Sequence, residues 1–244
     1  MGILKSILVW ITYLLTGGIF LVFIIPVSLL FLPFGKHKKV FSHFLFGYMK
    51  WIVRCALPFL QVLKIVEFTG AEKIGKSGII ISNHQSFLDG FLVMGHFPSV
   101  PLIKASYKYN PLFLWVAGFF DFVALDFFPA GFFDADKKLR KHLKNNDLLY
   151  ILPEGTRSSD GNIQKFQSLA FKIANDTQSP IFPVVLKYSE PIMSKSRESF
   201  IFTRKVNVKI HVLDEIRPAE NENTAKFIQR VYSTVVSHFD EIHF

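Results

Sequence analysis

Hydrophobic and polar positions divide the chain into a long apolar beginning and a remainder in which short apolar runs alternate with amphipathic stretches. Apolar runs predict strands, and helical spacing of apolar residues predicts helices. The predicted strands are Leu63–Thr69, Ile79–Ser82, Val100–Ile103, Phe122–Asp126, Leu148–Leu152, Ile181–Tyr188 and Val206–Val212. The predicted helices are Phe87–His96, Leu112–Phe120, Ala135–Asn145, Phe166–Asp176 and Thr224–Phe239. This alternation favours an α/β fold with a mixed, mostly buried β-sheet flanked by helices.

The beginning of the chain predicts a membrane element. Residues Ser6 to Gly35 form an uncharged run of 30 residues, and a helix needs only about 20 apolar residues to cross a bilayer core. Gly17-Gly18, Pro26 and Pro33 are positions where a helix bends. A spanning helix and a broken helical hairpin within one leaflet therefore both fit. The next apolar stretch, Val40–Leu63, contains basic residues and Trp51, which is typical of an interfacial helix.

Charge supports this division of the chain. The net charge is +9, and no acidic residue precedes Glu67. Seven basic residues occupy that first segment: Lys5, Lys36, Lys38, Lys39, Lys50, Arg54 and Lys64. Basic charge confined to the most apolar segment indicates attraction to an anionic membrane surface. The same apolar content argues against nucleic acid as a partner. We therefore predict a membrane-associated helical segment at residues 1–61 and a catalytic domain at residues 62–244.

His84 and Asp89 are candidate catalytic residues. His84 follows the predicted strand Ile79–Ser82, and Asp89 falls in the first turn of the next helix. A carboxylate that bonds one ring nitrogen raises the basicity of histidine and leaves the other nitrogen to accept a proton from an alcohol. Ser86 to Asp89 also fits a helix capping box, in which Asp89 satisfies the helix end. Both roles stay open for Asp89.

A second motif, Glu154-Gly155-Thr156-Arg157, follows the predicted strand Leu148–Leu152. Its glycine permits a tight turn, and its arginine offers planar donors suited to phosphate. An ordinary polar turn also fits these four residues.

The segment Gly70–Ser77 matches the phosphate-loop pattern G-x-x-x-x-G-K-[ST]. That pattern binds phosphate when a helix follows it, but the next residues, Gly78 to Ile81, predict a strand. The competing interpretation is a membrane-anchored nucleotide-binding protein that uses Gly70–Ser77. No G-x-S-x-G is present, and the single cysteine and eight histidines form no metal-ligand spacing. We predict no metal site.

The two motifs resemble those of the glycerolipid acyltransferase family, in particular the bacterial 1-acyl-glycerol-3-phosphate acyltransferases. Asn83, His84 and Asp89 match N-H-x-x-x-x-D. The second motif matches E-G-T-R with all four residues: Glu154, Gly155, Thr156 and Arg157. The resemblance spans about Val62 to Val212 and also includes Lys104, which stands at the family's lysine position.

The resemblance implies an O-acyltransferase of phospholipid biosynthesis. It would move a fatty acyl group from acyl-CoA or acyl-ACP to the hydroxyl of a lysophospholipid, giving phosphatidic acid from 1-acyl-glycerol-3-phosphate. His84 would be the general base, oriented by Asp89. Asn83, Lys104 and the residues Glu154, Gly155, Thr156 and Arg157 would bind substrate. No bound cofactor is implied; the thioester is a co-substrate, and acyl carrier protein is a candidate partner.

The resemblance, together with the lysines that follow the apolar run, places the enzyme on the cytoplasmic face of the inner membrane, with the catalytic domain in the cytoplasm. The chain departs from the family pattern around the acceptor. Phe127 stands where an arginine is usual, and Gln167 and Leu169 replace a lysine and a glycine. We therefore predict an acceptor less dependent on a phosphomonoester, or another lysolipid. Basic residues shortly downstream are candidates to replace the lost charge: Lys137, Lys138 and Arg140.

Overall fold

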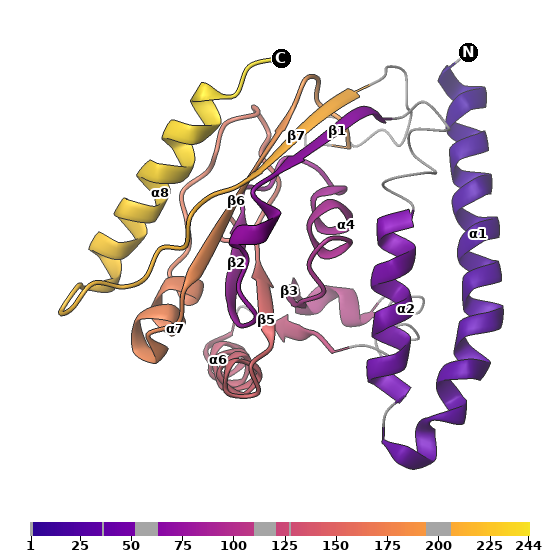
Figure 1. Ribbon diagram of the computed structural model, residues 1–244, viewed down its shortest axis with the longest axis horizontal. Helices are drawn as coiled ribbons and strands as arrows, with labels where there is room; N and C mark the ends of the chain where they lie inside the picture. The colour runs from indigo at the N-terminus through magenta and orange to yellow at the C-terminus, as the bar shows by residue number, and fades with distance from the viewer. Residues whose placement is uncertain (1, 36, 52–62, 110–120, 127, 194–205) are drawn as a thin grey trace.

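A seven-stranded β-sheet forms the centre of the molecule. The computed structural model describes residues 2–35, 37–51, 63–109, 121–126, 128–193 and 206–244 (Figure 1). The strands are β1 (Leu63–Thr69), β2 (Gly78–Ser82), β3 (Val100–Lys104), β4 (Val123–Leu125), β5 (Leu148–Ile151), β6 (Ile181–Tyr188) and β7 (Val206–Val212). Their order across the sheet is β1-β7-β6-β2-β5-β3-β4.

Five neighbouring strands run in the same direction, and two strands at one side run against them. Strands β6, β2, β5, β3 and β4 pair in parallel. β7 is antiparallel to β6, and β1 is parallel to β7. The structure thus confirms the predicted mixed sheet, and it places the carboxyl ends of the five parallel strands along one edge.

Helices cover both faces of this sheet. The α-helices are α1 (Gly2–Leu30), α2 (His37–Trp51), α4 (Asp89–Met94), α6 (Pro129–Lys144), α7 (Leu169–Thr177) and α8 (Thr224–Glu241). Short 3₁₀ turns are η1 (Leu32–Phe34), η3 (Ala71–Lys73) and η4 (Ala105–Tyr109). α4 packs on one face and contacts α2 outside it, whereas α6, α7 and α8 pack on the other face.

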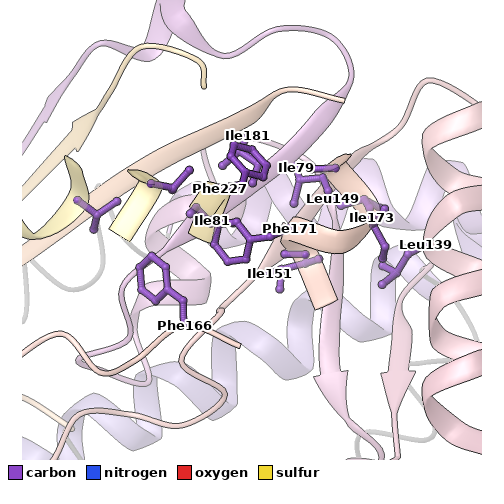
Figure 2. Close-up of a cluster of buried hydrophobic side chains, with 14 of the residues drawn as sticks. Ile79, Ile81, Leu139, Leu149, Ile151, Phe166, Phe171, Ile173, Ile181 and Phe227 are labelled. Carbon is purple, nitrogen blue, oxygen red and sulfur yellow. The ribbon is translucent and has the colours of Figure 1, made fainter. Parts of the chain in front are cut away.

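The alternation of side chains along each strand builds the two halves of the core. Ile79 and Ile81 of β2 point to the face covered by α6, α7 and α8 (Figure 2), whereas Ile80 points to the face covered by α4. All three side chains are fully buried. Because burial of one such side chain stabilises a fold by about 1.5–3 kcal/mol, both faces of β2 contribute to stability. β2 is therefore a rigid base for the loop that follows it.

Strand positions agree with the sequence better than helix positions do. β1, β6 and β7 have their predicted bounds. The helix predicted from Phe87 begins only at Asp89, because residues 83–88 form a loop. α6 begins at Pro129 instead of Ala135, since proline suits the first turn of a helix. α7 begins at Leu169, after Phe166, which is buried in irregular chain. The predicted helix 112–120 lies outside the described residues.

The N-terminal segment forms two adjacent helices. α1 continues through Gly17, Gly18 and Pro26, and the chain turns at η1, which contains Pro33. α2 then runs back beside α1 (Figure 1). Within the described part of the chain, no helix meets the length and hydropathy expected of a membrane span.

Candidate active site

The sheet brings the two sequence motifs together at its carboxyl edge. β2 ends at Ser82 and β5 ends at Ile151, and these strands are parallel neighbours. His84 therefore lies beside the turn that begins at Pro153. β3 pairs with the other side of β5 and ends at Lys104, which is exposed at the same edge. Carboxyl ends of parallel strands are where α/β proteins bind their ligands.

His84 and Asp89 form a dyad. The Nδ1 atom of His84 lies 2.9 Å from Oδ2 of Asp89. The Asp89 side chain is fully buried, whereas the His84 side chain is 18% exposed. Among the described residues, no partner is found for Nε2 of His84. Because the Asp89 carboxylate accepts a hydrogen bond from Nδ1–H of His84, Nε2 carries a lone pair directed away from the dyad.

The Asp89 carboxylate has four hydrogen-bond donors. Oδ2 also accepts the N–H groups of Gln85 (2.8 Å) and Ser86 (2.9 Å). Oδ1 accepts the hydroxyl of Tyr188 at 2.5 Å. The Ser86 hydroxyl in turn accepts the N–H of Leu88 at 3.1 Å, which completes a capping arrangement. One carboxylate therefore bonds both the backbone that leads into α4 and the ring of His84, and its catalytic role stays a prediction.

Glu154 holds the backbone of His84. Its Oε1 accepts the His84 N–H at 2.6 Å, and its Oε2 accepts the Gln164 N–H at 2.8 Å. The side chain is buried, and this burial raises the pKa of Glu154 to about 7, although the two N–H bonds act in the opposite direction. The Ser158 N–H donates to the His84 carbonyl at 2.7 Å. The loop after β5 therefore bonds both the N–H and the carbonyl of His84.

Asn83 ties the same loop to β6. Its Nδ2 donates to the Leu186 carbonyl and its Oδ1 accepts the Leu186 N–H, both at 2.8 Å. The side chain is fully buried. We expected substrate contact from Asn83 and Glu154, but their polar atoms are already bonded to backbone groups. The geometry favours positioning of His84 by both residues.

The remaining motif residues shape the turn. Gly155 has a φ of +70°, a conformation that favours glycine, and its N–H donates to the Leu152 carbonyl at 3.0 Å. Thr156 is partly exposed in this turn. Nη1 of Arg157 donates to the Met193 carbonyl at 2.8 Å. Arg157 therefore lies at the carboxyl edge with one guanidinium nitrogen bonded to the backbone, and its phosphate-binding role stays a prediction.

Two of the three downstream basic residues are paired with carboxylates. Arg140 bonds both Asp136 and Asp176, and Lys138 bonds Asp134 at 2.7 Å. α6 begins just after β4 and ends just before β5, so it runs away from the carboxyl edge. These pairs with carboxylates of α6 and α7 weigh against an acceptor role for Lys138 and Arg140, and such a role for Lys137 stays a prediction.

The Gly70–Ser77 segment joins β1 to β2 and lies at the opposite edge, where β2 begins. It contains only the 3₁₀ turn η3, and β2 follows it directly. It therefore lacks the following helix that a phosphate loop needs. Across the residues that the structure describes, no group of three or more His, Cys, Asp or Glu side chains is arranged to hold a metal ion.

Sequence reasoning missed Tyr188. Its contact with Asp89 joins residues 99 positions apart. The sequence did place Tyr188 at the end of the predicted strand. Only the pairing of β6 with β2, however, shows that this position lies beside the His84 loop.

Comparisons with known proteins agree with this arrangement. Residues 65–187 match the family model described as Acyltransferase. A 1-acyl-sn-glycerol-3-phosphate acyltransferase of Saccharomyces cerevisiae is 31% identical over 219 residues, covering 79% of this chain and 67% of the yeast protein. A chloroplastic enzyme of the same description from Arabidopsis thaliana is 28% identical over 217 residues, covering 85% of this chain and 59% of that protein.

The chain spans only about half of another relative. The chloroplastic 1-acyl-sn-glycerol-3-phosphate acyltransferase of Brassica napus is 29% identical, and the match covers 74% of this chain and 52% of that protein. The crystal structure of PlsC, a 1-acyl-sn-glycerophosphate acyltransferase from Thermotoga maritima, superposes with a TM-score of 0.76. That match covers 100% of this chain and 98% of PlsC at 22% identity, so it establishes a shared fold.

Proposed function

The chain belongs to the acyltransferase family, and we propose that it transfers a fatty acyl group from a thioester to the free hydroxyl of a lysophospholipid. The observation that carries this proposal is the His84–Asp89 dyad at the carboxyl edge, with Nδ1 of His84 bonded at 2.9 Å and the His84 side chain partly exposed. The proposed acceptor is 1-acyl-glycerol-3-phosphate, the acceptor in the names of the relatives. The donor is acyl-CoA or acyl-ACP.

The dyad performs the transfer by general acid–base catalysis. Nε2 of His84 takes the proton of the acceptor hydroxyl as its oxygen attacks the thioester carbonyl carbon. Asp89 stabilises the imidazolium that forms. When the tetrahedral intermediate collapses, the carbon–sulfur bond breaks, and the departing sulfur receives the proton from Nε2. The ester and a free thiol result, without an acyl-enzyme.

Charge at the same edge would hold the acceptor phosphate. Arg157 and Lys104 are the basic residues proposed for this role, because arginine and lysine both bind phosphate well. The Met193 carbonyl orients the Arg157 guanidinium. Since Lys138 and Arg140 of α6 are paired with carboxylates, and Phe127 stands where the family usually has an arginine, we propose that the enzyme also accepts lysolipids with larger headgroups.

The helices α1 and α2 would attach the enzyme to an anionic membrane surface. Many apolar side chains of this pair are exposed: Leu4, Ile7, Leu8, Ile11, Leu14, Leu15, Ile19, Val22, Phe23, Leu30 and Phe44. Exposed patches of this size mark interaction sites, and a membrane suits an apolar face with basic residues nearby. Exposed Lys38, Lys50 and Trp51 on α2 match the composition of a lipid interface. Burial in lipid would also bring the site close to its lipid substrates.

The test is thiol release from acyl-CoA and from acyl-ACP by purified protein, with a panel of lysolipid acceptors. We expect His84→Ala to lose roughly 10²–10⁴-fold in kcat, the usual contribution of a positioned general base. His142→Ala is the matched control, because Nδ1 of His142 lies 2.8 Å from Oδ2 of Asp147 at the same five-residue spacing, away from the carboxyl edge. The control should retain activity.

Three outcomes would each contradict a part of the proposal. Absence of thiol release with every acceptor would refute acyl transfer, and near-normal turnover by His84→Ala would refute the mechanism. A preference of about a hundredfold or more in kcat/KM for 1-acyl-glycerol-3-phosphate would refute the broad acceptor range, since it equals the loss expected from one or two charged contacts.

A further inference from the structure

We propose that Tyr188 is a positioning residue of the catalytic dyad, which fixes the Asp89 carboxylate and sets the basicity of His84. The inference rests on the proposed function of the dyad. It concerns a residue outside both sequence motifs, on the strand that lies beside β2.

The contacts of Asp89 divide unequally between its two oxygens. Oδ2 receives His84 and two backbone N–H groups. The contact found for Oδ1 among the described residues is the Tyr188 hydroxyl, at 2.5 Å. Since the Asp89 side chain is fully buried, no solvent replaces a lost donor at Oδ1. An unsatisfied charged oxygen in such a place is costly.

β6 holds both ends of the loop between β2 and α4. Asn83 at one end of the loop bonds the backbone of Leu186, and Asp89 at the other end bonds the side chain of Tyr188. These two anchor points are two residues apart on one strand. The loop that carries His84 is therefore attached to β6 at two points. The backbone of Leu186 forms one of them, and the side chain of Tyr188 forms the other.

Tyr188 remains a donor at all working pH values. Burial and the negative charge of Asp89 raise its pKa well above 10, so the hydroxyl keeps its proton. Tyr188 consequently exchanges no proton in the reaction.

The hydroxyl also tunes the carboxylate. A hydrogen bond to Oδ1 stabilises the ionised form of Asp89 and spreads its charge over both oxygens. Without that bond, more negative charge resides on Oδ2, and the imidazolium of His84 is bound more strongly. Removal of the hydroxyl should therefore raise the pH at which His84 titrates and also loosen the direction of the ring.

The experiment compares Tyr188→Phe with Tyr150→Phe. Tyr150 is the matched control, because it is a buried tyrosine of β5, on the other side of β2, whose hydroxyl bonds Ser82 Oγ at 2.8 Å instead of Asp89. Two quantities are measured: the titration midpoint of the His84 ring by NMR, assigned with His84→Ala, and the pH dependence of kcat. The NMR readout requires no turnover, so it tests Tyr188 even if the proposed function fails.

For Tyr188→Phe we expect a rise in the His84 midpoint of about 0.5–1 pH unit, with a loss in kcat of about 10–100-fold and little change in KM, as for the loss of a bond to a charged group. Tyr150→Phe should leave both midpoints unchanged. An unshifted His84 midpoint in Tyr188→Phe would overturn the proposal. A fall in kcat with an unshifted midpoint would likewise overturn it, because a merely structural tyrosine would give that result.

Discussion

Replacement of Glu154 by glutamine should remove a pH dependence from the stability of the fold. Burial raises the pKa of Glu154 from an ordinary 4.5 to about 7, so between these values the folded state binds a proton that the unfolded chain has released. Stability from this group is therefore fully present below about pH 4.5 and is lost as the pH rises through about 7.

The size of this effect follows from the two pKa values. Each pH unit inside the window changes the free energy of unfolding by up to about 1.4 kcal/mol, so the wild type loses roughly 2.5 kcal/mol from this group between pH 5 and pH 8. For a chain of this length, 1 kcal/mol corresponds to about 2–4 °C in Tm, which gives about 5–10 °C. Glutamine is isosteric and does not titrate in this range.

The assay is thermal unfolding of wild type and Glu154→Gln across this pH range in one detergent. The quantity of interest is the difference in Tm between the two proteins at each pH, since other groups titrate equally in both. The Tm of the wild type minus the Tm of Glu154→Gln should fall as the pH rises. Glutamine also presents an amide to a backbone N–H, so Glu154→Gln should lose activity through displacement of His84. Parallel Tm curves for the two proteins would show that Glu154 is ionised throughout and would refute the reasoning.

Two further predictions concern sites away from the dyad. Burial and the nearby His238 lower the pKa of His211, so the unfolded chain binds the proton more readily, and stability should fall as the pH drops through about 6.5. His211→Gln should remove this acid loss in Tm, and an unchanged acid limb would contradict the assignment. Lys76→Ala should leave acyl transfer unaltered, and neither the wild type nor this variant should bind a nucleotide tightly, because Gly70–Ser77 connects two strands at the edge opposite His84. Tight ATP binding by the wild type that is lost in this variant, measured by calorimetry, would restore the competing interpretation.

Local patterns accounted for the features that depend on neighbouring residues. Apolar runs placed β1, β6 and β7, because a buried strand needs continuous or alternating apolar side chains whatever its partners are. The spacing of His84 and Asp89 indicated their contact, since five positions across a loop and a helix start allow the carboxylate to reach the ring. The helix starts at α6 and α7 were missed, because exposed aromatics and buried irregular chain there do not follow helical periodicity.

The residues that support the dyad could be identified only from the three-dimensional fold. The order β6-β2-β5 is what brings Leu186 and Tyr188 to one side of the His84 loop and Glu154 to the other. These contacts join residues 70 to 103 positions apart, and no local period encodes such distances. Sequence patterns were enough to identify the chemical groups and the strands that carry them. The packing of parallel strands determined which groups meet, because a buried carboxylate or amide must find its hydrogen-bond partners on whichever strand lies beside it.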